Sequence, residues 1–383
     1  MRCTAALSTH PTPTVATGEV IGQVLETLGT EPDLAFVFVT APFAGAIDDI
    51  AAATRQVLRP RALLGTTAVS VVGGDQEIED EAALTLWAAA FDGAPPPELV
   101  RLEALPTAEG TLVSGLPDDI APGSTLVVLA DPFTMPIDAV LAHWHATRPD
   151  LAVIGGLASA ARGPGGNRLV LDGRVHTDGA VGAVLAPGVA LSTVVSQGCR
   201  PIGDPMIVTK AERNIIYELA GQRALTRLLT MVEGLDEDER ALAQAGLHIG
   251  CVIDERQVEF SRGDFLVRNV LGADRNVGAI AVGDEVEVGS TVQFQVRDAA
   301  SADDDLHALL GGHHAAGALL FTCNGRGSHL FGRPGHDAEV VSDHVDAAAV
   351  GGMFCAGEVG PIGGRSFLHG FTASVLLLDD SGE

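Results

Sequence analysis

The sequence predicts an α/β (α+β) protein of two domains, and three observations support this. Apolar runs of strand length alternate with amphipathic stretches of helical length, which is typical of strands joined by helices. A strand–helix–strand unit recurs at a fixed spacing along the chain, which indicates internal duplication. The chain has 383 residues, more than a single hydrophobic core of about 250–300 residues accommodates.

The first unit begins with the strand Leu34–Thr40, which is apolar throughout and is therefore expected to be covered on both faces. A helix is predicted at Asp48–Leu58. It carries acidic residues in its first turn, where they interact favourably with the positive end of the helix dipole. Ala62–Ala68 is the next predicted strand. After a turn at Gly73 and Gly74, the strand Ala83–Ala88 completes a βαββ unit.

The same unit recurs 90 positions later without a gap. Identical residues at this offset include Pro42, Phe43, Ile47 and Asp48, which match Pro132, Phe133, Ile137 and Asp138. We interpret this as a duplication; chance similarity between two βαβ units is the alternative. A looser third copy is predicted near the C-terminus, with strands at Ala318–Cys323, Val350–Ala356 and His369–Leu378 and a short helix at Asp343–Ala349.

A different segment separates the second copy from the third. It is predicted to contain helices at Ala211–Ala220 and Ala224–Val232, and the run Asp236–Arg240 is expected to be a solvated helix start. Its predicted strands are Gly246–Ile253, Leu266–Val270, Val277–Val282 and Val292–Val296. We therefore expect an N-terminal segment (1–33), a first domain (34–205, repeats about 34–93 and 125–188) and a second domain (206–379).

Charge and composition exclude several classes of function. The net charge is −27, from 50 acidic and 23 basic residues, so the chain repels nucleic acids and anionic lipid surfaces. The cysteines number five, and their spacing matches neither a disulfide framework nor a zinc motif. No uncharged apolar run reaches the ~18–20 residues of a membrane span. We expect a cytoplasmic protein with no nucleic-acid or membrane partner and no cofactor.

Several stretches, taken in order, resemble the FIST family (F-box and intracellular signal transduction proteins). They are Ala62–Ala68 with Glu77 and Ile78, Ser196–Gly203, Phe260–Arg268, Phe321–Gly327, Gly357–Pro361 and Phe367–Thr372. The resemblance covers about residues 34–378 and implies a sensory module for small ligands, with amino acids proposed. Many members carry a kinase, cyclase, chemoreceptor or F-box segment beside this module. We expect none here, and therefore a separate signalling output protein as partner.

The third copy holds the candidate ligand site. Its loop Asn324–Gly335 follows an apolar strand, and ligands of open α/β sheets bind beyond the carboxyl ends of strands. Arg326 could hold a carboxylate through two hydrogen bonds, and Glu358 suits an ammonium group. The predicted ligand-binding residues are Cys323, Asn324, Gly325, Arg326, Gly327, Gly357, Glu358 and His369. His369 is expected to start the last strand and to orient the ligand.

Alternatives remain open at this stage. Arg326 and Glu358 could pair with each other and brace the loop instead of opening into a shared cavity. Cys323 could be a nucleophile, but no triad motif accompanies it, and the histidines near residues 313–344 match no standard metal spacing. We expect no catalytic residue and no metal. The leading function is recognition of a small polar, amino acid-like ligand; the alternatives are an enzyme acting on such a metabolite and a protein-binding scaffold.

Overall fold

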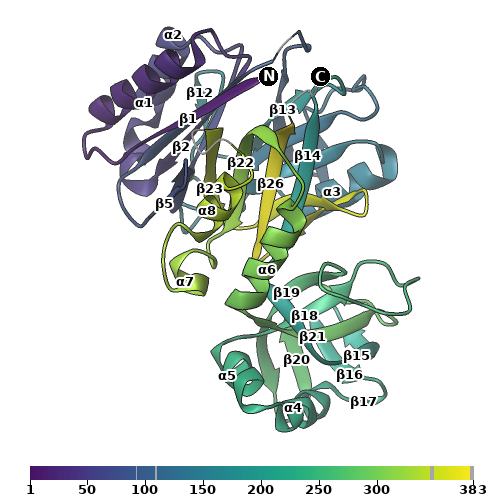
Figure 1. Ribbon diagram of the computed structural model, residues 1–383. Coiled ribbons are helices and arrows are strands. Elements are labelled where there is room, and N and C mark those ends of the chain that lie inside the picture. Colours follow the sequence, from purple (N-terminus) through teal and green to yellow (C-terminus); the bar gives the residue numbers. More distant parts are fainter. Residues whose placement is uncertain (92, 108–109, 346–348, 380–383) are drawn as a thin grey trace. The chain divides into compact units, whose positions relative to one another are not determined.

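The computed structural model describes residues 1–383 except 92, 108–109, 346–348 and 380–383 (Figure 1). By packing, the chain divides into a larger unit, Met1–Val195 with Leu306–Glu383, and an inserted unit, Ser196–Asp305. The sequence predicted one border, at residue 206, between two consecutive domains. The packing gives two borders instead, because the third repeat packs with the first two and the inserted unit interrupts it. The mixture of helices and sheets confirms the predicted α/β (α+β) class.

The larger unit begins with two repeats and their flanking strands. The elements of the first are β1 (Arg2–Ser8), α1 (Pro13–Leu28), β2 (Leu34–Thr40), η1 (Ala41–Ala46), α2 (Ile47–Val57), β3 (Ala62–Ala68), β4 (Ser70–Gly73), β5 (Gln76–Glu79) and β6 (Leu84–Ala90). Those of the second are β7 (Glu98–Thr107), β8 (Gly110–Ser114), β9 (Thr125–Ala130), α3 (Ile137–Thr147), β10 (Ala152–Leu157), β11 (Leu169–Leu171), β12 (Arg174–His176) and β13 (Ala180–Leu185).

The third repeat is interrupted by the inserted unit. Its elements are β14 (Leu191–Gln197), α6 (Ala299–Leu310), β22 (Ala315–Cys323), α7 (Ser328–Phe331), α8 (His336–Ser342), β23 (Val350–Cys355), β24 (Glu358–Ile362), β25 (Arg365–His369) and β26 (Thr372–Asp379). The inserted unit comprises β15 (Cys199–Glu212), β16 (Ile215–Leu219), β17 (Gln222–Arg223), α4 (Ala224–Gly234), α5 (Glu237–Ala245), β18 (Leu247–Val252), β19 (Phe265–Asp274), β20 (Ala279–Val282) and β21 (Thr291–Arg297).

Each repeat builds the same arrangement of strands. Two parallel strands, joined through a helix, form the centre: β2 with β3, β9 with β10, and β22 with β23. The last strand of each repeat pairs antiparallel with the first of these, as β6, β13 and β26. The third repeat therefore has the topology of the first two, despite its looser sequence match.

The three repeats exchange hairpins in a closed cycle. The hairpin β4–β5 of the first repeat pairs with β23 of the third, and β24–β25 of the third pairs with β10 of the second. The hairpin β11–β12 of the second pairs with β3 of the first. Each of these three sheets thus contains strands from two repeats. One repeat removed from this cycle would leave two sheet edges unpaired.

Apolar residues of all three repeats form one shared core. It contains Phe36, Phe38, Trp87, Leu129, Ile154, Phe321 and Met353. A second apolar layer lies under the helices of each repeat, and α1 and α2 pack together over the sheet that holds β1 and β2 (Figure 1). Close approach of the parallel strands β9 and β10 requires glycine at position 155: Gly155 has φ +147°, and a Cβ there would lie 1.9 Å from the carbonyl oxygen of Val128.

The inserted unit is a sheet of seven strands in the order β15-β21-β18-β19-β20-β16-β17, and pairing of β15 with β16 closes the sheet on itself. Its two ends are adjacent, because the Asp305 carboxylate accepts hydrogen bonds from Ser196 Oγ and Gln197 N, each 2.9 Å. Adjacent ends are the usual property of a domain inserted into another.

Two local predictions are corrected by the structure, and a third falls partly outside the described residues. The expected helix Ala211–Ala220 is a hairpin of β15 and β16 that turns at Arg213, because strand pairing overrides a weak helical pattern. His369 does not start the last strand; it ends β25, and β26 begins at Thr372. The helix expected at Asp343–Ala349 partly falls on 346–348, outside the described residues, while α8 ends at Ser342. The helix starts at Ala224 and after Asp236 are confirmed.

Candidate functional site

The candidate site lies where β22 and β23 end side by side. Cys323 pairs with Cys355 in the parallel ladder, and Asn324 N donates to Cys355 O at 3.0 Å. A tight turn follows, in which Arg326 N donates to Cys323 O at 2.8 Å. The loop therefore begins at the carboxyl edge of the strands, where the sequence predicted a ligand site.

Arg326 is enclosed by protein. It is 1% exposed, and its Nε and Nη2 bind the two carboxylate oxygens of Asp337 at 2.7 and 2.8 Å. The ring of Phe331 lies 5.3 Å from the guanidinium carbon, within the range of a cation–π contact. The alternative pairing expected for Arg326, with Glu358, is replaced by this bidentate pair with Asp337.

Asp337 is the centre of a buried network. Besides Arg326, its carboxylate accepts from Thr322 Oγ1 at 2.6 Å and lies 3.0 Å from His336 Nδ1. Burial alone would raise the pKa of Asp337, but the charge and hydrogen bonds of Arg326 outweigh it and hold the pKa below its ordinary value. Asp337 therefore stays ionised, and Arg326 keeps a compensating partner inside the protein.

Two carboxylates of the first repeat hold this loop from outside. Glu77 on β5 accepts from the backbone N–H groups of Gly335, Asp337 and Ala338 at 2.8–3.2 Å, at the start of α8. Glu79 accepts from Ser328 N at 2.9 Å, at the start of α7. Burial and the neighbouring Asp337 raise the pKa of Glu77 to about 7. The exchanged hairpin thus supplies the hydrogen-bond acceptors that the N–H groups of these short helices would otherwise find in water.

Gly327 permits this contact between repeats. It has φ +55°, and a Cβ at this position would lie 2.5 Å from Glu79 Oε1. Only glycine allows both the left-handed backbone and the approach of the carboxylate. Gly327, predicted as a ligand residue, therefore has a structural role at the junction of the first and third repeats.

Glu358 is the second buried charge of the candidate set. It is the first residue of β24, and its Oε2 accepts from Thr372 N and Oγ1 at 3.1 and 2.9 Å. Its burial raises the pKa of Glu358 to about 8, against the opposing effect of Thr372 and of the Arg326 charge. Glu358 therefore carries a proton at neutral pH. His369 lies opposite it in the β24–β25 ladder, with Nε2 2.9 Å from Gly360 O.

Polar atoms without partners remain inside this region. Among the described residues, Asn324 Oδ1, Arg326 Nη1 and Glu358 Oε1 are buried and have no hydrogen-bond partner of good geometry, although the Cys323 thiol favours the charged form of Glu358. Cys323, Asn324 and Gly325 are half-buried, so solvent reaches the lip of the loop while Arg326 and Glu358 stay enclosed. The structure thus brings most predicted residues to one region but buries the two charged ones.

Sequence reasoning assigned no role in the site to Asp337, Glu77 or Glu79. Asp337 lies two residues after Gly335, in the first turn of α8. A carboxylate at a helix start usually has a structural role. Asp337 is also part of no ligand-binding motif. Glu77 lies more than 250 positions from its partners, and only the hairpin exchange brings it there. Within the described residues, no three His, Cys, Asp or Glu side chains gather as metal ligands, and no helix has the length and apolar character needed to cross a membrane.

Comparison with known proteins supports the sequence resemblance. Mb0898c of Mycobacterium bovis, named an uncharacterized protein, is 43% identical over 391 residues that cover 100% of both chains. MT0656 of Mycobacterium tuberculosis, also named uncharacterized, is 41% identical over 387 residues, 99% of this chain and 100% of the relative. The FIST N domain family matches residues 33–222 and the FIST C domain family residues 223–361, so their border falls within β17, just before α4 of the inserted unit. The chain therefore belongs to the FIST family and contains both of its domains.

Proposed function

We propose that this protein is a sensor that binds a small polar metabolite, with amino acids as the first class to test, and signals to a separate output protein. FIST domains are associated with sensory signal transduction, and this chain matches both of them. The proposed site is the lip Cys323–Gly325 together with Arg326 and Glu358, at the carboxyl edge of β22.

The observation that supports this site is the pair of buried atoms without a partner, Asn324 Oδ1 and Arg326 Nη1, beside Glu358, whose Oε1 has at most the weak thiol donor of Cys323. Each such atom costs about 1–3 kcal/mol in a closed interior. A zwitterion offers a carboxylate oxygen to Arg326 Nη1 and an ammonium group to Asn324 Oδ1 and Glu358 Oε1. Binding would therefore satisfy groups that the free protein leaves without partners.

Ligand binding at this site requires the loop to move. Arg326 and Glu358 are buried, whereas Cys323–Gly325 are half-buried, so a ligand reaches the charged groups only after the lip opens. The loop is held by Glu77 and Glu79 of the first repeat. Displacement of the loop therefore changes contacts between two repeats, which gives the binding event a way to reach a distant surface.

A screen of thermal stability against the common amino acids and small organic acids tests the proposal. A ligand present at about one hundred times its Kd should stabilise the protein by about 2.7 kcal/mol. Mass spectrometry should recover the ligand unchanged; its consumption would indicate an enzyme. If no compound stabilises the protein, the site proposal fails and the scaffold alternative is favoured.

Glu358 gives the screen a sharper second measurement. Glu358 has a pKa of about 8, so an ammonium ligand must displace its proton at neutral pH. Calorimetry in buffers of different ionisation enthalpy should therefore show proton release on binding. The Glu358→Gln variant should release no proton and bind less tightly, whereas Glu26→Gln, an exposed change on α1, should behave like the parent. Equal proton release in both variants would contradict the role of Glu358.

A further inference from the structure

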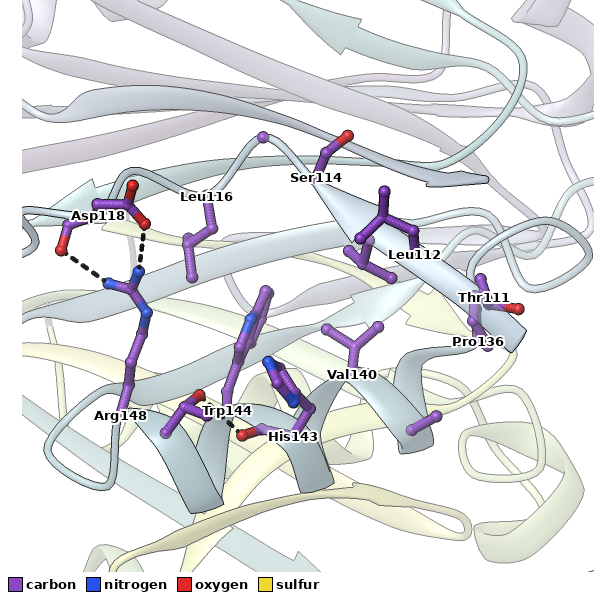
Figure 2. A pocket seen from close by; sticks show the side chains of 14 residues that line it. Thr111, Leu112, Ser114, Leu116, Asp118, Pro136, Val140, His143, Trp144 and Arg148 are labelled. Carbon is purple, nitrogen blue, oxygen red and sulfur yellow. Dashed lines mark hydrogen bonds and ion pairs between the residues drawn. The ribbon is translucent and has the colours of Figure 1, made fainter. Parts of the chain in front are cut away.

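The second repeat contains a cavity that none of the candidate site residues line. It lies between β8 and α3 and has a volume of 390 Å³ (Figure 2). This volume falls in the range of small-molecule sites, which are about 300–1,000 Å³ and mostly apolar with a few placed polar groups. Its apolar lining residues include Leu112, Val113, Leu116, Val140 and Trp144.

An aromatic ring forms one wall of this cavity. Trp144 projects from α3 towards Leu116, as Figure 2 shows, and Val113 of β8 packs in the same apolar layer of the second repeat. Trp144 is only 6% exposed and packs into the apolar layer of the second repeat. The ring is therefore fixed, and the small part of it that lines the cavity offers an apolar contact for a ligand ring.

A weakly held cation lies at one end of the cavity. The two Arg148 hydrogen bonds to Asp118, one to its carbonyl oxygen and one to Oδ1, are both 3.4 Å long, at the outer limit for such bonds (Figure 2). The Asp118 side chain is fully exposed, whereas that of Arg148 is 25% exposed. An exposed pair of this geometry contributes little to stability, so an incoming anion displaces it at small cost.

We propose that this cavity is a second ligand site, which takes a small aromatic carboxylate with its ring against Trp144 and its carboxylate on Arg148. The apolar lining supplies contact area for the ring. Because the chain has a net charge of −27, an anion approaches only where a local cation compensates, and Arg148 provides it at the cavity end. This site is independent of the proposed sensor site in the third repeat.

Phenylacetate and its uncharged analogue phenylacetamide test the proposal directly. The chain has two tryptophans, and Trp87 is fully buried with its Nε1 bound to Ala349 O at 3.0 Å, so changes in emission report on Trp144. Phenylacetate should quench or shift this emission saturably, and phenylacetamide should bind about tenfold more weakly, the ratio expected for one lost charge-assisted hydrogen bond. Equal affinity for the two compounds, or a signal that never saturates, would overturn the proposal.

Two substitutions with opposite expected effects complete the test. Arg148→Met should weaken phenylacetate binding by about tenfold or more while leaving phenylacetamide unchanged. Asp118→Asn should strengthen phenylacetate binding, because it removes the negative charge that competes with the ligand carboxylate for Arg148. Arg59→Met, an exposed change remote from this cavity in the first repeat, serves as the control. Unchanged phenylacetate affinity in both test variants would refute the site, and the gain in Asp118→Asn cannot arise from misfolding.

Discussion

Replacing Glu358 by glutamine should make the protein more stable at alkaline pH. Glu358 is fully buried, and its pKa is raised from the ordinary 4.5 to about 8. Because the folded state binds this proton more tightly than the unfolded chain, the associated stability is complete below about pH 4.5 and is lost as the pH rises through about 8. Glutamine carries no titrating proton, and its amide oxygen can still accept from Thr372.

The expected size follows from the shift. Each pKa unit corresponds to about 1.4 kcal/mol, so the ionised Glu358 lowers the free energy of unfolding by up to about 5 kcal/mol above pH 8. At about pH 5 the parent and Glu358→Gln should differ by no more than about 1 kcal/mol. Glu77, whose pKa is also raised, adds its own slope to both proteins, and the difference between them therefore isolates Glu358.

Denaturant unfolding at a series of pH values measures this effect. The free energy of unfolding of the parent should fall relative to Glu358→Gln by about 1.4 kcal/mol per pH unit between about pH 5 and 8. Glu26→Gln should keep the pH dependence of the parent. If Glu358→Gln also kept it, Glu358 would be ionised in the folded state across this range, and the argument from burial would be wrong.

Three further predictions concern the network, the strands and the inserted unit. Arg326→Leu should lower stability by about 3–5 kcal/mol in denaturant unfolding, because it leaves a buried carboxylate without its cation; an unchanged midpoint would contradict the network. Gly155→Ala should destabilise by more than about 2 kcal/mol through its close backbone contact, while Gly18→Ala, with open space on α1, should stabilise by up to about 1 kcal/mol. Replacing residues 198–298 by a short Gly-Ser linker should leave the larger unit with a cooperative transition in circular dichroism, since Asp298 N and Gly198 O are 3.3 Å apart.

The sequence alone was sufficient to predict the bounds of a strand in which every residue is buried. The strand predicted at Leu34–Thr40 is found with those bounds, and every residue in it is buried. An apolar run of that length between turn residues admits few other structures. The segment Ala211–Ala220 shows the opposite case: its residues fit a helix as well as a hairpin, and the choice depends on pairing with β20, a strand distant in sequence.

In the candidate site, too, features set by nearby residues could be predicted, whereas contacts between residues distant in sequence could not. The position of the loop after β22 could be predicted, because it follows from chain order and strand direction alone. The partner of Arg326 could not, since residues 326–337 have no regular period and several carboxylates were within reach. The contact of the loop with Glu77 was still harder to predict, because it depends on a hairpin of the first repeat that pairs with a strand of the third.

The hairpin exchange gives the three repeats different roles despite their common topology. In the third repeat the loop after the first strand is long, and the N–H groups at the starts of its two short helices need hydrogen-bond acceptors. Glu77 and Glu79 meet that need from the first repeat, so the loop cannot be displaced without breaking hydrogen bonds to another repeat. Each repeat therefore contributes a hairpin to a neighbour, and displacement of the third-repeat loop would disturb β5 of the first repeat, which lies at the edge of the sheet that contains β22.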